Sequence, residues 1–174
     1  RMGRITASLR SFARRGDDKG QASLGKAVDA ALQVLGARVE SASLQLHRQF
    51  IDVQVQIDQT RLEQILVNLI GNALDAMQAQ PQPELWLEGE EFNGKYRLRV
   101  RDNGHGVDAE ARKHLFEPFF TTKPGEQGLG LGLTLSASLA AATGGNLAVE
   151  HPASGGTAFV LSLPLASPQQ VESK

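Results

Sequence analysis

The stretch from Asp58 to Met77 constrains the fold of this chain more than any other, because its apolar residues recur at intervals of three and four. That spacing predicts an amphipathic helix with one face buried against a core. Asp58 stands just before the apolar run and is expected to be the N-cap of the helix. The apolar positions are Leu62, Ile65, Leu66, Leu69, Ile70, Ala73 and Met77.

Two asparagines, Asn68 and Asn72, lie one turn apart within this helix and therefore share a face. Asparagine is a mediocre helix former, so two of them in mid-helix call for a reason. A carboxamide offers a neutral oxygen that suits Mg²⁺, a metal usually shared with the phosphates of a substrate. A solvated polar stripe is the alternative, and the helix alone does not decide between the two.

The composition is that of one ordinary soluble domain. The chain has 174 residues, of which 41% are hydrophobic and 21% charged, and its net charge is −1. This balance gives no reason to expect binding to nucleic acid or to an acidic membrane. The absence of cysteine excludes disulfides, a thiol nucleophile and a cysteine-based zinc site. No apolar run has the length of a membrane span, and no signal peptide is visible.

The two ends differ from the middle of the chain. Residues 1–15 carry one apolar stripe among arginines, which predicts the end of a longer helix from a bundle or coiled coil. Residues 16–21 are a polar, glycine-bounded linker, residues 22–165 the expected domain, and residues 166–174 a polar, flexible tail. Because the chain begins at an arginine in mid-helix, we expect it to be a fragment of a longer protein.

The remaining periodicities alternate between helix and strand. Ser23 is expected to cap a helix that runs to about Val39, and Asn93-Gly94 is a strong hairpin signal. Along the chain, the expected elements follow the order helix, strand, strand, three times over. This order predicts an α/β sandwich with one layer of mixed sheet and one layer of helices. The other expected elements are strands at 44–47, 53–57, 85–90, 96–100, 146–150 and 157–163 and helices at 109–115 and 132–142.

A carboxylate followed by closely spaced glycines stands at the end of one expected strand. The residues are Asp102, Gly104 and Gly106, with Asn103 and His105 between them. Glycines let the backbone approach a flat ligand closely, and a carboxylate accepts hydrogen bonds from an exocyclic amine such as that of adenine. The alternative is a common turn with an aspartate cap.

The second glycine-rich run, Gly128–Leu133, leads into a helix. Successive backbone N–H groups and the positive end of a helix dipole together form a site for phosphates. The run is neither a Walker A loop nor a dinucleotide fingerprint. Lys123 precedes it and can reach a terminal phosphate, although a solvated lysine is the simpler interpretation. Phe116, Phe119 and Phe120 bracket the start of this loop, either as its anchors or as core residues.

Taken in order, these motifs and Gly155-Gly156-Thr157 resemble the N, G1, F, G2 and G3 boxes of the ATP-binding domain of histidine kinases. That domain is part of a wider family with gyrase, the Hsp90 chaperones and the MutL repair proteins. The resemblance covers about residues 22–165. It implies the two-layer Bergerat-type fold and ATP and Mg²⁺ as cofactors.

The resemblance also implies a role for each matching residue. Asn72 and Asn68 would coordinate Mg²⁺, Asp102 would accept from the adenine amino group, and Thr157 would lie beside the adenine. Gly106 would shape the floor of the pocket, under an ATP lid of about residues 116–131. The further nucleotide-binding residues that it implies are Asp75, Gly104, Phe116, Thr122, Lys123, Gly128, Leu129, Gly130, Leu131, Gly132 and Leu133.

The same resemblance bears on the chemistry. Gyrase-like hydrolases use a glutamate one turn before the metal-binding asparagine to activate water, and here that position is Asn68. An amide cannot act as a general base, so phosphoryl transfer to a histidine is favoured over hydrolysis. The expected catalytic residues are Asn68, Lys123 and, as a secondary candidate, Glu63. A gyrase-type hydrolysing clamp and an inactive nucleotide-binding module remain the alternatives.

The phosphoacceptor is expected to lie outside this chain. None of His47, His105, His114 and His151 stands in the His-Glu-x-x-x-Pro-like motif of the family's dimerisation helix, so transfer would occur only in trans. The chain resembles sensor kinases of the nitrogen-regulation type, including those for C4-dicarboxylate transport. This implies a dimerisation domain and a response regulator as partners. The parent would be a homodimer on the cytoplasmic side of the bacterial inner membrane.

Overall fold

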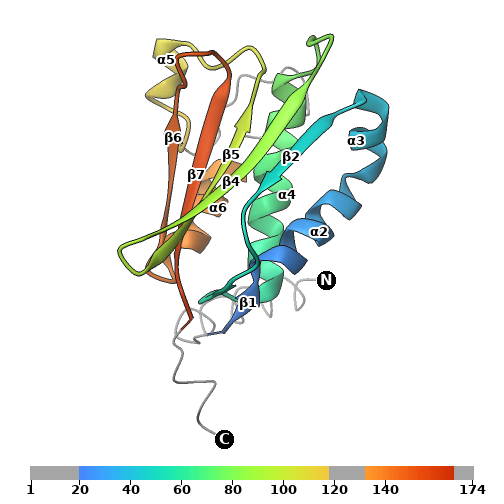
Figure 1. Ribbon diagram of the computed structural model, residues 1–174. Coiled ribbons are helices and arrows are strands. Elements are labelled where there is room, and N and C mark those ends of the chain that lie inside the picture. The colour runs from blue at the N-terminus through green and yellow to red at the C-terminus, as the bar shows by residue number, and fades with distance from the viewer. Residues whose placement is uncertain (1–19, 118–131, 167–174) are drawn as a thin grey trace, which may run out of the picture.

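The centre of the fold is a five-stranded mixed sheet with the strand order β2-β4-β5-β7-β6 (Figure 1). The computed structural model describes residues 20–117 and 132–166. β2 and β4 are parallel and the other neighbours are antiparallel, as the sequence predicts for a mixed sheet. The strands are β2 (Gln45–Gln49), β4 (Glu84–Phe92), β5 (Lys95–Asp102), β6 (Asn146–Glu150) and β7 (Thr157–Pro164).

The predicted asparagine helix is α4 (Gln59–Ala76), and it packs between α2 and α6 on one face of the sheet (Figure 1). Every apolar position predicted to face inward is buried, and the side chain of Asp58 caps the helix by accepting from the N–H of Arg61. The Asp58 cap was predicted, and it is confirmed. The other helices are α2 (Leu24–Val34), α3 (Gly36–Ala42), α5 (Ala109–Arg112) and α6 (Gly132–Ala141).

The predicted hairpin forms between β4 and β5. Asn93 and Gly94 both adopt positive φ, at 53° and 79°, which is the geometry of a type I′ turn. Along β5, Tyr96, Leu98 and Val100 point into the core while the residues between them face outward. This alternation also sends Asp102, the last residue of the strand, to the helix side of the sheet.

The structure differs from the prediction at three places. The first helix does not run to Val39, because it ends at Val34 and Leu35 leads into α3 with a φ of −94° and a ψ of 13°. The strand expected at 53–57 is only β3 (Gln54–Val55), which pairs with β1 (Ala22–Ser23) in a separate two-stranded sheet. The helix expected at 109–115 already ends at Arg112.

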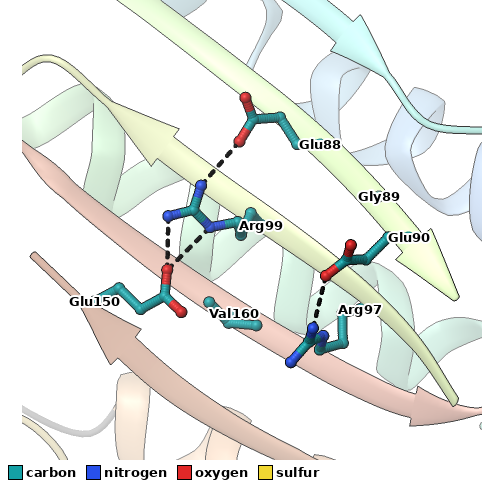
Figure 2. Close-up of a pocket in the computed structure, with 7 residues that line it drawn as sticks. All are labelled: Glu88, Gly89, Glu90, Arg97, Arg99, Glu150 and Val160. Atoms are coloured by element: carbon teal, nitrogen blue, oxygen red, sulfur yellow. Dashed lines mark hydrogen bonds and ion pairs between the residues drawn. The ribbon is translucent and has the colours of Figure 1, made fainter. Parts of the chain in front are cut away.

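The outer face of the sheet carries a ladder of paired charges. Arg99 bridges Glu88 and Glu150, with nitrogen–oxygen distances of 3.1 and 2.6 Å, and Arg97 pairs with Glu90 at 2.6 Å (Figure 2). A cavity of about 390 Å³ opens among these side chains (Figure 2). Each of its three carboxylates is paired with an arginine, and the cavity lies on the face away from Asp102. We therefore look for the functional site on the helix side.

Candidate functional site

Asp102 is a buried carboxylate at the end of β5. Only 2% of its surface is exposed, and its Oδ1 accepts a hydrogen bond from the N–H of Gly104 at 2.8 Å. Thr157 is its partner across the β5–β7 pair, and the backbone of Thr157 also hydrogen-bonds to it. Burial raises the pKa of Asp102 to about 6, although both hydrogen bonds and the nearby His105 oppose the shift. Such a carboxylate is costly for the fold and is typical of a functional position.

The glycines around Asp102 allow segments of backbone to meet. A Cβ on Gly104 would collide with the carbonyl oxygen of Ala76 at the end of α4, and a Cβ on Gly156 would collide with the carbonyl oxygen of Asp102. Gly106 adopts a φ of +78° and faces Gly156. A Cβ on Gly106 would lie 3.4 Å from the carbonyl oxygen of Gly156. The loop after β5 therefore sits directly on the end of α4.

Thr157 contributes a polar atom that the fold itself does not use. The residue is 3% exposed, and its Oγ1 is buried without a hydrogen-bond partner among the described residues. Buried hydroxyls are normally paired, and an orphan calls for a ligand or a water. Together with Asp102, this atom gives the site an acceptor and a hydroxyl side by side across one strand pair, which suits the edge of a nitrogenous base.

Asn68 joins α4 to the start of α6. Its Nδ2 donates to the carbonyl oxygen of Gly132 at 2.9 Å and to Oγ of Ser136 at 3.1 Å. Because a carbonyl can only accept, this pairing fixes the orientation of the carboxamide. A Cβ on Gly132 would lie 2.7 Å from Asn68 Oδ1, so a larger residue there would displace the carboxamide of Asn68. Asn68 and Asn72 share a face of α4, as predicted, and Asn72 is half-buried.

The structure separates Glu63 from these two asparagines. Glu63 is half-buried on α4, five residues before Asn68 and nine before Asn72. At about 100° per residue, it lies about 140° around the helix from the first and about 180° from the second. This arrangement does not favour the catalytic role that we considered for Glu63.

Asp75 lies on the asparagine face but is already engaged. Its Oδ1 is 2.5 Å from Nη2 of Arg38, which reaches across from α3. Neither Arg38 nor Ser136 was singled out in the sequence. Both contacts join segments far apart in the chain, so no local pattern signals them.

The base of the predicted lid is held by α6. Thr134 Oγ1 donates to the carbonyl oxygen of Phe116 at 2.7 Å, and the side chains of Phe116 and Leu133 pack against the core. The other residues predicted for the lid fall outside the described residues. They are Phe119, Phe120, Thr122, Lys123, Gly128, Leu129, Gly130 and Leu131.

The contact between Asn68 and Ser136 makes a testable prediction. We expect Ser136→Ala to lower the free energy of unfolding by about 1 kcal/mol, because it removes a buried hydroxyl that accepts from the half-buried amide of Asn68. Ser138→Ala, an exposed position on the same helix, is the matched control and should change stability by less than about 0.5 kcal/mol. Urea unfolding measures both variants, and equal losses would contradict the assignment of this contact.

A family match now accounts for this arrangement. Residues 57–167, more than half of the chain, match the histidine kinase-, DNA gyrase B- and HSP90-like ATPases. The chain belongs to this family. Within it, the domain is 38% identical over 169 residues to the C4-dicarboxylate transport sensor protein DctB of Pseudomonas aeruginosa, covering 94% of this chain and 27% of the relative. It is 36% identical over 170 residues to the sensor protein FixL of Bradyrhizobium diazoefficiens, covering 95% and 33%.

Solved structures agree with the family. The mycobacterial sensor histidine kinase MprB is similar with a TM-score of 0.73 and 26% identity, covering 84% of this chain and 97% of that one. The catalytic domain of the histidine kinase ThkA gives a TM-score of 0.74 and 25% identity, covering 85% and 96%. The fold is therefore that of histidine kinase catalytic domains, as the sequence predicts. The chain spans about a quarter to a third of the length of the curated relatives named above.

The described residues bear on metal binding and on membrane insertion. No cluster of three His, Asp or Glu side chains in residues 20–117 and 132–166 can hold a metal ion by itself. A hard cation on the asparagine face would be held by carboxamide oxygens and ligand phosphates, and Mg²⁺ is a hard cation that takes oxygen ligands. Within the same ranges, no helix is long and apolar enough to cross a bilayer.

Proposed function

We propose that this domain binds ATP with Mg²⁺ and transfers the γ-phosphoryl group to a histidine of a dimerisation domain, as the catalytic module of a two-component sensor histidine kinase. The observation that carries the proposal is the buried Asp102 beside the hydroxyl of Thr157, which has no hydrogen-bond partner in residues 20–117 and 132–166. A carboxylate at this depth is costly without a ligand to donate to it, and the adenine amino group is such a donor.

The adenine end of the site is supported by Asp102, Thr157, Gly104 and Gly106. Asp102 accepts from the base, and Thr157 Oγ1 bonds to it directly or through a water. The glycines let the backbone of the loop after β5 pack closely against the end of α4 and against Gly156, which holds Asp102 and Thr157 in place for a base. These roles follow the family resemblance at matching positions.

The phosphate end is supported by α4 and the start of α6. Asn72 and Asn68 offer carboxamide oxygens to the metal, and the first turn of α6 at Gly132 places a helix N-terminus near the phosphates. When bound, Mg²⁺ would neutralise the charge of the phosphates during transfer. Lys123 and the glycine backbone of the lid remain predictions for the same task.

Transfer needs no general base on the asparagine face. Position 68 is an amide whose Nδ2 is committed to α6, so it does not activate water as a glutamate would. Catalysis would consist of positioning and charge stabilisation, with the acceptor histidine supplied in trans. A response regulator would then take the phosphoryl group. The similarity to the C4-dicarboxylate transport sensor protein DctB supports a sensor-kinase parent. The parent would be a homodimer at the cytoplasmic side of a bacterial inner membrane.

Incubation with γ-labelled ATP and a separate dimerisation domain tests the proposal. We expect label on the histidine of the added domain, dependent on Mg²⁺, and no label on this chain alone. Steady release of phosphate without any acceptor would favour a hydrolysing clamp. ATP binding without transfer to any dimerisation domain of the relatives would favour an inactive module.

A further inference from the structure

Arg38 is a cation that the structure holds over the polar face of α4. Its Nη2 lies 2.5 Å from Oδ1 of Asp75, and its Nη1 lies 3.9 Å from the position of a Cβ on Gly71. Gly71 and Asp75 flank Asn72 along the helix. The guanidinium group therefore covers the turn of α4 that carries Asn72.

The break between α2 and α3 positions Arg38 beside Gly71 and Asp75 of α4. α2 ends at Val34, and α3 begins a new helix at Gly36 that lies against α4 (Figure 1). None of the seven residues of α3 is buried, so the segment gains little from burial. The side chains of Arg38 and Asp75 are 44% and 21% exposed, and ion pairs of that exposure stabilise a fold by about 1 kcal/mol or less. Stability alone is a weak reason for this placement.

The ion pair also lies between the two ends of the candidate site. At one end, the loop of Asp102 and Gly104 packs on Ala76. At the other end, Asn68 meets Gly132 at the start of α6. Residues 68 and 76 are about 12 Å apart along the helix axis. A nucleotide with its base at Asp102 and its phosphates directed toward α6 passes the turn over which Arg38 lies.

We propose that Arg38 binds the phosphates of the nucleotide and that Asp75 is a positioning residue that holds the guanidinium group beside Asn72. The planar guanidinium group carries five N–H donors in a fork that matches phosphate oxygens. Asp75 occupies part of this fork, and the exposure of Arg38 leaves room for a phosphate at the rest. This inference rests on the proposed function. Arg38 would supply a positive charge from outside the lid, and Asp75 would act on the nucleotide only through Arg38.

Calorimetric titration of the 174-residue chain with ATP, ADP and adenosine separates this role from a structural one. For Arg38→Ala we expect about 10-fold weaker binding of ATP, about 3-fold weaker binding of ADP, and a change of less than about twofold for adenosine. Arg48→Ala is the matched control, because Arg48 forms a comparable exposed pair with Asp29 at 2.8 Å on the side of β2. That control should leave the affinity for all three ligands unchanged.

Repeating the titration without Mg²⁺ tests the part assigned to Asp75. If Asp75 acts through Arg38, we expect Asp75→Asn to weaken ATP binding about 3-fold in the presence of Mg²⁺ and about 3-fold in its absence. A loss confined to Mg²⁺-containing buffer would make Asp75 a metal ligand and overturn its positioning role. Equal losses of ATP and adenosine in Arg38→Ala, or no loss of either, would overturn the phosphate role. Failure of the unaltered chain to bind ATP would overturn the proposed function as well.

Discussion

Replacing Asp102 with asparagine is expected to weaken ATP binding by at least about 100-fold while making the empty domain more stable at neutral pH. Asp102 Oδ1 accepts from the N–H of Gly104, so the amide oxygen of an asparagine would take that place. The NH₂ group would then face the adenine amino group, donor against donor. An unpaired buried polar group costs about 1–3 kcal/mol, and the lost bond to the base adds to this.

The gain in stability follows from the pKa of Asp102. Its pKa is about 6 in the folded state and near 3.8 in the unfolded state, so folding favours the protonated carboxyl. This contribution is fully present below about pH 4 and is lost as the pH rises through about 6. At pH 7 the buried charge costs up to about 3 kcal/mol, and Asp102→Asn should recover about 1–3 kcal/mol of it. ATP binding by the unaltered chain should correspondingly weaken below about pH 6.

Urea unfolding of the empty chain between pH 4 and pH 8 measures this effect, with calorimetry for the nucleotide. Asp108→Asn is the control, since Asp108 caps α5 by accepting from Ala111 and asparagine caps helices equally well. It should change neither the nucleotide affinity nor the shape of the pH profile. An Asp102→Asn variant that binds ATP normally, or that keeps the pH profile of the unaltered chain, would contradict the role given to this carboxyl.

The second large effect is expected at Gly156. Its φ is +79°, and a Cβ there would collide with the carbonyl oxygen of Asp102. Gly156→Ala must therefore adopt a strained backbone and also push β5 away from β7 at the candidate site. We expect a loss of about 3 kcal/mol or more in the free energy of unfolding, and ATP binding weakened by displacement of Asp102.

Gly155 offers a control one residue away. Its φ is +102°, but no atom of the residues that the structure describes lies within 4 Å of a Cβ at this position. Gly155→Ala should show only the cost of the backbone conformation, about 1–2 kcal/mol, and should keep its affinity for ATP. Urea unfolding and nucleotide titration of both variants make the comparison. Equal losses would mean that the contact with Asp102 does not govern the site.

The elements with local signals were the predictable part of this fold. The three-and-four spacing after Asp58 yielded α4, Ser23 and Asp58 cap the expected helices, and Asn93-Gly94 forms the expected turn. Each depends on interactions within a few residues, which a single sequence contains. The family boxes added the two-layer Bergerat-type fold, whereas the order of the strands in the sheet was not predicted.

The parts that were missed depend on contacts between distant segments. β1 was not predicted and β3 is shorter than predicted; the two strands of two residues each pair with one another, and Val55 of β3 also bridges Leu165. The break after Val34 lies in a segment whose residue pattern predicts one continuous helix. The family resemblance suggested Asp75 as a nucleotide ligand, whereas its partner Arg38 lies 37 residues earlier in the chain and was not predicted. The assigned roles of the site residues stay predictions until nucleotide binding is measured.

Calorimetric titration of ATP and GTP into the unaltered chain, each with and without Mg²⁺, tests the central claim most directly. Guanine presents a carbonyl oxygen where adenine presents its amino group, and that oxygen would meet the carboxylate of Asp102. The account predicts ATP binding that strengthens with Mg²⁺ and exceeds GTP binding by at least about 100-fold. Equal affinity for the two nucleotides, or no binding of ATP in either condition, would contradict it.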